Sequence, residues 1–375
     1  MFGTLVDITL YGESEPRARQ AANDVLQEFQ RLHNRLHAWK PSELSELNAA
    51  FAKGESMAVS TELAAMLQDA TQLSQQSGGL FNPAIGGLVQ LWGFHADEFK
   101  ADLPEEKRVL QWVRANPQMG DIVLPGTVTH PLPNGHGKDA TPDNETRQAR
   151  FPLSNFPPQA GERANESLRE FHVNETARYL PKSSGEKDVF IRSVNKAVQL
   201  DLGGYAKGYA LDRAAEILRK RGINNALVNI GGNVIALGRH GKRPWRIGIQ
   251  HPRKPGALAT LELHDGEAIG TSGDYQRYFM SGDKRYCHLI DPRNGHPVQG
   301  VQSVTILTRG TRAGILSDAA SKPLFIAGTK GWHTAAAQMN LPEAMLVDDT
   351  GNLHVTAAFQ KRLEFTDKNI HVQVE

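Results

Sequence analysis

The pattern of apolar positions alternates between helical and strand periods along the chain. Residues 4–11 alternate as a strand does, and apolar side chains then recur every three or four positions from about residue 16 to residue 36. This spacing predicts a helix with one apolar face. A second helix should begin after Ser60, a favoured N-cap residue, and end at Ser77-Gly78-Gly79, because glycine readily terminates a helix. Two further helices are predicted at 206–221 and about 311–326.

Short strand-like runs dominate the second half of the chain. Gly, Asn, Asp and Pro residues separate them, as they do in sheets whose strands are joined by turns. The predicted strands are 226–230, 233–237, 245–250, 258–263, 275–280, 285–290 and 301–308, followed by 344–348, 353–356 and 370–374. Together with the helices, this order predicts an α+β fold of mixed, mostly antiparallel sheets flanked by helices. We found no internal repeat of fixed period.

Residues 115–186 differ from the rest of the sequence. Nine of the 20 prolines fall there, apolar periodicity is weak, and Asn, Glu, Ser and Gly are frequent. This composition predicts a partly disordered surface insertion within a single domain of residues 1–375. Asn144, Asn165 and Asn174 match the N-glycosylation pattern, but such matches arise readily by chance in a segment of this composition.

Composition narrows the classes of protein and of site. The chain is 39% hydrophobic and 22% charged, which is typical of a soluble globular protein. Its formal net charge of +1 provides no global field for nucleic acid or an anionic membrane. Cys287 is the single cysteine, which excludes an intramolecular disulfide and a cysteine-based zinc site. No apolar run approaches the about 20 residues that span a bilayer.

The start of the sequence carries no pattern of a leader peptide. No positively charged segment followed by an apolar stretch precedes residue 4, so we expect no leader in this chain. The chain nevertheless begins abruptly inside a strand-like run, which is also what removal of a leader would leave.

The most informative polar residues lie between residues 271 and 295. His288 stands in a strand-like run three residues before Asp291 and its Pro-x-x-Gly turn, and Thr271-Ser272-Gly273-Asp274 forms a second polar, turn-forming cluster. A lone histidine in a sheet is more often structural. The two neighbouring clusters favour a general base beside a polar, phosphorylated ligand, because the ordinary pKa of histidine lies near working pH. Cys287 should point to the opposite face, into the core.

Two glycine-containing motifs admit a structural and a functional interpretation. In Asp201-Leu202-Gly203-Gly204, glycines join a strand end to a helix. The backbone N–H groups of such a turn suit a phosphate, which Lys207 in the first helical turn could neutralise. A plain strand–turn–helix explains these residues equally well. For Asn229-Ile230-Gly231-Gly232-Asn233, a hairpin turn is the better interpretation, and close approach to a ligand is the alternative.

Asp318 and Lys322 should lie one turn apart on one helix face. The carboxylate could hold Mg²⁺ or form an i,i+4 salt bridge with the lysine, and spacing alone favours the salt bridge. Trp39 and the aromatic residues between 81 and 94 could stack on a planar ring, although core packing is their usual role.

In combination, these motifs resemble the ApbE family, the FAD:protein FMN transferases. The resemblance implies a T-fold-related α+β architecture, binding of FAD, and Mg²⁺-dependent transfer of its FMN half to a Ser or Thr hydroxyl of a target flavoprotein, with AMP leaving. It covers nearly the whole chain outside 115–186. The matching segments are 2–4, 42–48, 81–83, 91–94, 201–212, 225–233, 271–278, 288–297, and Asp318 with its helix.

The resemblance also implies roles for individual residues. His288 matches the catalytic histidine, and we add the hypothesis that Asp291 or Asp274 orients its loop. The Gly204 carbonyl and the Asp318 carboxylate would hold Mg²⁺. The residues expected to border the FAD are Phe2, Trp39, Leu80, Phe81, Asn82, Asp201, Lys207, Ser272 and Leu289.

Two positions depart from the family pattern. Lys322 stands where the family commonly has a metal-binding threonine, four residues after the aspartate, and Asn294 also replaces a usual threonine. A protonated lysine cannot ligate Mg²⁺ and repels it. Three outcomes stay open: Lys322 turns away and water completes the metal shell, its ammonium replaces part of the metal's charge, or transfer is lost and only flavin binding survives.

Other functions are compatible with the same residues. One is a non-catalytic flavin carrier or assembly factor for a redox complex, and another is an FAD pyrophosphatase that uses water as the acceptor. Family members are usually exported and membrane-tethered, so the resemblance implies a periplasmic or cell-envelope location, and a cytoplasmic one otherwise.

Overall fold

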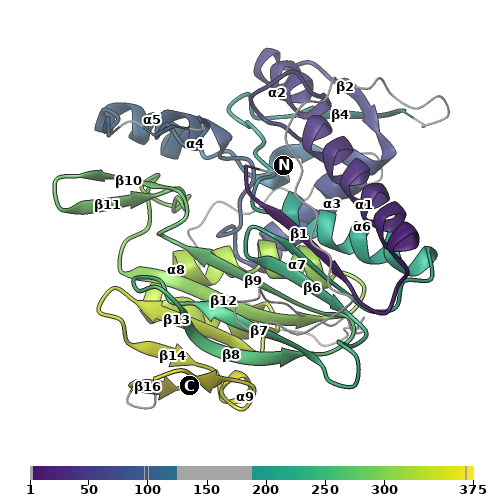
Figure 1. Cartoon of the computed structure of the whole chain (residues 1–375). Helices are drawn as coiled ribbons and strands as arrows, with labels where there is room; N and C mark the ends of the chain where they lie inside the picture. Colours follow the sequence, from purple (N-terminus) through teal and green to yellow (C-terminus); the bar gives the residue numbers. More distant parts are fainter. Residues whose placement is uncertain (1–2, 97, 100, 125–187, 368–369) are drawn as a thin grey trace, which may run out of the picture.

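A large antiparallel sheet forms the centre of the molecule in the computed structural model, which describes residues 3–96, 98–99, 101–124, 188–367 and 370–375 (Figure 1). Within these residues, neighbouring strands of the sheet run antiparallel except the last pair, which is parallel. The strand order is β1 (Val6–Leu10), β5 (Ala226–Ile230), β6 (Asn233–Leu237), β9 (Glu267–Gly273), β12 (Val301–Arg309), β13 (Ala344–Asp348), β14 (Leu353–Val355) and β16 (Val372–Val374).

Three smaller sheets complete the strand content of the described residues. One has the order β15 (Glu364–Phe365), β8 (Ala257–Leu263) and β7 (Trp245–Gln250), and it covers one face of the central sheet. The second has the order β2 (Met57–Ser60), β4 (Asp188–Ser193) and β3 (Ile122–Val123). The third is the hairpin of β10 (Tyr278–Ser281) and β11 (Lys284–Cys287).

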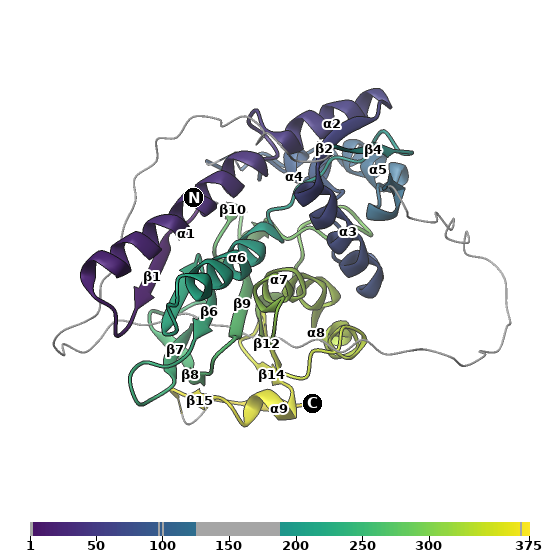
Figure 2. The ribbon, with the colours of Figure 1, turned by 90° about the vertical axis from the view of Figure 1, so that its right-hand side faces the viewer.

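Helices cover the opposite face of the central sheet, as the two views show (Figures 1 and 2). These are α1 (Glu15–Arg35), α6 (Ala206–Lys220), α7 (Ala313–Ala319) and α8 (Ser321–Gln338). The remaining helices are α2 (Glu43–Lys53), α3 (Thr61–Gln76), α4 (Gly86–Leu91), α5 (Glu106–Ala115), the 3₁₀ turn Met119–Asp121 and α9 (Ala357–Gln360).

Amphipathic patterning explains why the helices lie where they do. Val25, Phe29 and Leu32 of α1 are fully buried against α6 and the sheet, as the predicted apolar face requires. The Ser60 hydroxyl accepts from the Leu63 N–H at 3.2 Å, which confirms the predicted N-cap of α3. The predicted end of that helix is also confirmed, since Ser77 is its C-cap residue.

A separate apolar cluster joins α4 and α5 to the β10–β11 hairpin. Phe94 stacks on Phe279 with ring centroids 5.6 Å apart, and Trp92 stacks on Tyr286 at 5.7 Å. The Trp92 indole also donates to the Gly295 carbonyl at 2.8 Å. These contacts fix the loop that follows His288 against the segment between α4 and α5.

The structure confirms the predicted α+β class and its mostly antiparallel sheets, and it corrects several local predictions. Thr271-Ser272-Gly273 is not a turn but the end of β9, in the interior of the central sheet. Residue propensities do not predict a strand here, because glycine and serine are typical of turns. The small residues are needed because α7 lies directly against this strand. A Cβ on Gly270 would be 2.2 Å from the Ser317 carbonyl oxygen.

Other helix and strand boundaries also differ from the predicted ones. The strand expected from residue 275 starts at Tyr278, and the predicted helix at 311–326 is two helices, α7 and α8. Gly328, at φ 67°, interrupts α8 as well. The helix α2 was not predicted, although Ser42 begins it with a capping box.

Part of the predicted insertion lies within the described residues. Residues 116–124 include the 3₁₀ turn and β3, so they belong to the folded body, whereas 125–186 lie outside the described residues, as does Phe2. No helix in the described part of the chain combines the length and the apolar character needed to cross a bilayer.

Candidate active site

A buried carboxylate, Asp318, lies at the centre of a cluster of charged groups. Its side chain is fully buried near the end of α7. One carboxylate oxygen, Oδ1, lies 2.5 Å from Lys322 Nζ and 3.5 Å from Lys207 Nζ, and it accepts from Asn233 Nδ2 at 3.4 Å. The other oxygen accepts from the Gly208 N–H at 3.0 Å. The predicted i,i+4 salt bridge between Asp318 and Lys322 is therefore confirmed.

Electrostatics keep this carboxylate ionised. Burial raises the pKa of Asp318, but Lys207 and Lys322 together outweigh burial, and the net pKa is lower than usual. Burial also lowers the pKa of Lys322, to about 8, and Asp318 opposes that shift while Lys207 adds to it. At neutral pH the cluster therefore holds one carboxylate and two ammonium groups.

Close packing of α6 on α7 brings Asp318 to the N-terminal turn of α6. A Cβ on Gly208 would lie 2.2 Å from the Gly314 carbonyl oxygen, so only glycine permits this approach of the two backbones. Asp212, one turn further along α6, accepts from the N–H groups of Gly314 and Ile315 at 2.7 and 2.9 Å and thereby caps α7.

The glycine turn before α6 lies beside the segment around Phe81. The Asp201 N–H donates to the Pro83 carbonyl at 2.8 Å, and the Asp201 carboxylate accepts from the Gly203 N–H at 2.8 Å. Phe81 is buried, and its ring edge lies 3.8 Å from the position of a Cβ on Gly204. The structure thus brings together Phe81, Asp201 and Gly204, which come from two distant parts of the sequence.

Asn82, Leu80 and Trp39 have different surroundings. Asn82 is buried, donates to the Pro117 carbonyl at 2.9 Å and accepts from the Ala84 N–H at 3.1 Å, so its amide holds the local backbone. Leu80 is partly exposed next to Phe81. Trp39 is partly buried at the edge of the main core, 5.6 Å from the His95 ring. Phe2, which the resemblance also places at the FAD, is outside the described residues.

His288 follows the end of β11 directly and is held by Arg277. Its backbone N–H donates to the Arg277 carbonyl at 3.0 Å, and its Nδ1 lies 3.2 Å from the same oxygen. That contact makes Nδ1 the protonated nitrogen of the neutral ring and leaves Nε2 as a proton acceptor. The guanidinium of Arg277 donates to the Phe94 carbonyl at 2.8 Å.

The imidazole lies in the field of the same two lysines as Asp318. Burial, reinforced by the charges of Arg277, Lys207 and Lys322, lowers the pKa of His288 to about 3. His288 and Asp318 are 30 positions apart in the sequence and belong to different elements. The charges of Lys207 and Lys322 act on the pKa of both residues, so His288 lies within electrostatic reach of the Asp318 cluster.

The two candidate orienting carboxylates each bind an arginine. Asp274 forms a bidentate pair with Arg253, at 2.7 and 2.6 Å, and Arg285 lies 3.5 Å away. Asp291 binds the Arg293 side chain at 2.7 to 3.1 Å and accepts from the Arg293 N–H at 2.9 Å. Both carboxylates therefore hold the loops on either side of the β10–β11 hairpin, and a role in orienting His288 stays a prediction.

Ser272 is linked to the charged cluster through Ser321, whereas Leu289 lies in an apolar core cluster. The Ser272 hydroxyl is 2.7 Å from the Ser321 hydroxyl, which in turn donates to the Asp318 carbonyl at 2.9 Å. Leu289 is buried in the apolar cluster under α8, together with Cys287, whose predicted core position is confirmed. Roles at the FAD for these residues stay predictions.

Sequence reasoning missed three contributors to this site. Arg277 lies in the matching segment 271–278, but no local pattern predicts its role. Its carbonyl contacts His288 because the β10–β11 hairpin brings the two residues together. Asp212 lies within a matching segment, but a cap supplied from another helix has no local pattern. Asn233 belongs to the hairpin motif, where Gly231 and Gly232 have φ of 56° and 89°, as predicted, yet its side chain reaches Asp318.

The residues expected to hold Mg²⁺ do not fit the ion as they stand. Lys322 occupies the open side of the Asp318 carboxylate, and its side chain also lies against Gly204, with Cε 3.1 Å from the position of a Cβ there. An ammonium and a divalent cation about 4 Å apart repel each other by roughly 8 kcal/mol at an effective dielectric constant of about 20. Among the described residues, no group of three or more His, Cys, Asp or Glu side chains could hold a metal.

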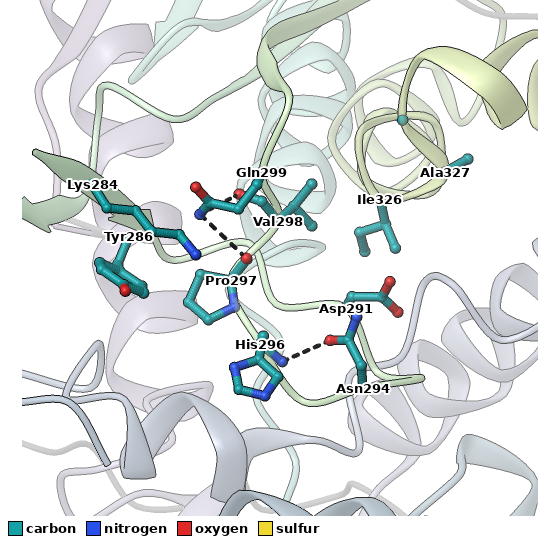
Figure 3. A pocket seen from close by; sticks show the side chains of 11 residues that line it. Lys284, Tyr286, Asp291, Asn294, His296, Pro297, Val298, Gln299, Ile326 and Ala327 are labelled. Atoms are coloured by element: carbon teal, nitrogen blue, oxygen red, sulfur yellow. Dashed lines mark hydrogen bonds between the residues drawn. The ribbon is translucent and has the colours of Figure 1, made fainter. Parts of the chain in front are cut away.

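A pocket of about 400 Å³ lies beyond the Asp291 loop (Figure 3). Lys284 and Tyr286 of β11 form one wall, and residues 326–328 of α8 form another. The loop between them is held by the His296 N–H, which donates to Asn294 Oδ1 at 2.8 Å. Among the described residues, the lining includes Asp291 but not His288, Asp318 or the two lysines, so the pocket shares the Asp291 loop with the candidate site and does not contain the Asp318 cluster.

Known proteins resemble this chain in sequence over most of its length. It is 36% identical over 364 residues to a protein named FAD:protein FMN transferase from Rhodobacter capsulatus, and the match covers 97% of this chain and 57% of that protein. A protein of the same name from Klebsiella pneumoniae (strain 342) is 28% identical over 379 residues, covering 100% of this chain and 95% of the relative. The chain thus spans little more than half of the Rhodobacter relative.

Solved structures share the fold. The ApbE protein of Thermotoga maritima superposes with a TM-score of 0.72 at 24% identity, covering 96% of both chains. The apo form of the Pseudomonas stutzeri flavinyl transferase ApbE gives 0.68 at 22% identity, covering 95% of this chain and 92% of that one. The sequence profile of the ApbE family matches residues 2–346. With fold and sequence in agreement over nearly its whole length, the chain belongs to the ApbE family.

Proposed function

We propose that this chain is a flavin transferase that moves the FMN half of FAD to a Ser or Thr hydroxyl of a target flavoprotein and releases AMP. The observation that carries the proposal is the cluster of Asp318 with Lys207 and Lys322, at 3.5 and 2.5 Å, whose lysine charges also lower the pKa of His288. A proton acceptor within the field of two cations suits transfer to and from a diphosphate. The names of the relatives, FAD:protein FMN transferase, support the same reaction.

The reaction requires an anionic substrate to be held and its developing charge to be stabilised. In the proposed step, the acceptor hydroxyl oxygen bonds to the FMN-side phosphorus of the diphosphate. The bond from that phosphorus to the bridging oxygen breaks, and AMP leaves with the bridging oxygen. In this proposal Lys207 and Lys322, the two ammonium groups beside Asp318, stabilise the charge on the phosphoryl oxygens, which is the main contribution of protein groups to phosphoryl transfer.

His288 takes the proton of the attacking hydroxyl in this scheme. Its Nδ1 faces the Arg277 carbonyl, so Nε2 is the nitrogen that accepts. Burial, together with the charges of Arg277 and the two lysines, keeps the imidazole neutral in the ligand-free chain. A bound diphosphate offsets the lysine charges, so the imidazole becomes a stronger base when substrate is present.

The Mg²⁺ implied by the resemblance has no part in these steps. The position of Lys322 on the Asp318 carboxylate is the reason, because the ion and the ammonium would compete for the same oxygen.

Replacement of His288 by alanine tests the assignment. His288→Ala should bind FAD with nearly unchanged affinity and lose transfer, since the imidazole acts on the proton of the acceptor and not on the flavin. His333→Ala, an exposed histidine of α8, is the matched control. FAD binding is followed by quenching of flavin fluorescence, and transfer by covalent flavin fluorescence on candidate acceptor flavoproteins after denaturation.

The same assay separates the alternatives. Unchanged transfer by His288→Ala would remove the histidine from the mechanism. Formation of free FMN and AMP without any acceptor would identify a pyrophosphatase. FAD binding with no transfer to any acceptor and no AMP would identify a flavin carrier.

A further inference from the structure

The carboxylate at the centre of the site is already neutralised by a cation from the same chain. Lys322 Nζ donates to Asp318 Oδ1 at 2.5 Å and also to the Asp318 main-chain carbonyl. Its side chain is 14% exposed, so the ammonium is enclosed by the protein and is not a mobile surface group. Lys207 adds a second ammonium, 3.5 Å from the same oxygen.

We propose that the ammonium of Lys322 takes the place of a divalent cation in this chain, so that it binds FAD and transfers FMN without metal. The part that concerns transfer rests on the proposed function. The part that concerns the Asp318 carboxylate and the binding of metal does not.

The position of Lys322 supports the substitution. The resemblance assigns the metal to the Gly204 carbonyl and the Asp318 carboxylate. The Nζ of Lys322 lies on that carboxylate, and its Cε lies 3.1 Å from the position that a Cβ on Gly204 would take. The lysine therefore occupies the Asp318 oxygen that a metal ion would need, and its side chain lies beside residue 204.

The charge of the cluster is already positive without a metal. Lys322, Lys207 and Asp318 together leave a net charge of +1, because the two ammonium groups outweigh burial and keep the carboxylate ionised. Adding a divalent ion would raise the net charge to +3 and place the ion next to a buried ammonium.

The surroundings hold the ammonium in place. Asp318 Oδ2 is fixed by the Gly208 N–H at 3.0 Å, and the Asp318 carbonyl accepts from the Ser321 hydroxyl at 2.9 Å. Lys322 also follows Ser321 directly in α8, so its backbone is fixed by the same contacts. An ammonium has three donors, and the one not used by the two Asp318 oxygens can bind an oxygen of the diphosphate.

Direct metal titration of the unmodified protein is the first test. Mn²⁺ alone is added to the chain, and the signal of free Mn²⁺ is followed by electron paramagnetic resonance. We expect no stoichiometric binding below millimolar concentration. FAD affinity should also agree within about twofold in EDTA and in Mg²⁺. Stoichiometric Mn²⁺ binding at micromolar concentration, or loss of FAD binding in EDTA, would overturn the proposal.

Conversion of the lysine to the family's usual residue is the second test. Lys322→Thr should gain a Mn²⁺ site at least tenfold tighter than that of the unmodified chain. Its FAD affinity should fall at least tenfold in EDTA and recover in Mg²⁺. Lys322→Met removes the cation without adding a ligand, so its FAD affinity should fall in both conditions. Lys330→Thr, at an exposed position of the same helix, is the matched control and should change neither.

Transfer measured in EDTA separates this inference from the proposed function. Transfer that proceeds in EDTA supports both. Transfer that requires Mg²⁺ retains the function and overturns the inference. If no acceptor is modified in either condition, the proposed function fails, and the Mn²⁺ and FAD titrations still decide whether Lys322 replaces the metal.

Discussion

Gly208 offers the sharpest test of how the fold builds the site, because α6 and α7 make their closest approach there. A Cβ at this position would lie 2.2 Å from the Gly314 carbonyl oxygen and 2.7 Å from Ile315 Cα. Non-bonded heavy atoms prefer a separation of about 3.5 Å, so Gly208→Ala must move the helices apart by roughly 1 Å. Both neighbouring atoms are backbone, so no side chain can turn aside to make room.

The expected loss of stability follows from three contributions. Overpacking of a tight contact destabilises by about 1–3 kcal/mol. Separation of the helices also weakens the hydrogen bond of 3.0 Å from the Gly208 N–H to the buried Asp318 carboxylate, and bonds of this type contribute about 1.5–3 kcal/mol. The better helix propensity of alanine offsets about 1 kcal/mol. The free energy of unfolding should therefore fall by about 2–4 kcal/mol.

Urea unfolding followed by tryptophan fluorescence measures this loss, and FAD titration measures its effect on the site. Gly120→Ala is the matched control, since no atom lies within 4 Å of its added Cβ and its φ is not positive. We expect the control to change stability by less than about 0.5 kcal/mol. If Gly208→Ala were as stable as Gly120→Ala and bound FAD equally well, the close approach of α6 and α7 would not be what positions Asp318.

Three further predictions concern other parts of the site. Because the pKa of His288 is about 3 when folded and about 6.5 when unfolded, the unfolded chain gains the proton first as pH falls. Stability present at pH 7 should therefore decrease by about 1–2 kcal/mol at pH 5, and His288→Gln should lose less in urea unfolding at the two pH values. Arg253→Met leaves buried Asp274 without its bidentate partner and should cost about 2–3 kcal/mol in urea unfolding, against less than about 1 for Arg246→Met in an exposed pair. Trp92→Phe leaves a loop carbonyl without its donor and should cost about 1–2 kcal/mol in thermal unfolding, with faster amide exchange at 291–299.

Much of the fold could be predicted from local sequence patterns. The apolar face of α1, the cap at Ser60 and the glycine hairpin between β5 and β6 each depend on residues close together in the sequence. The pairing of Asp318 with Lys322 belongs to the same class, because one helical turn separates them. In each case the interaction that stabilises the element is encoded within a few positions.

The remaining features depend on contacts between distant segments. The strand β9 has the composition of a turn, and its small residues are explained only by the carbonyl of α7 that lies against Gly270. The Gly208 N–H and the Asp318 carboxylate are 110 positions apart. No pattern around either residue encodes that bond, which explains why reasoning from sequence identified Asp318 but not the geometry around it.

The same long-range contacts explain how a histidine with an unusually low pKa can serve as a base. Burial and the charges of Arg277, Lys207 and Lys322 make the protonated ring unfavourable in the ligand-free chain. The two lysines are also the groups that a diphosphate would neutralise, because both ammonium groups border the Asp318 carboxylate. Binding of the anion therefore removes part of the field that weakens the imidazole. Proton uptake by His288 is thereby coupled to occupancy of the site, and an acceptor hydroxyl that arrives before FAD meets a poor base.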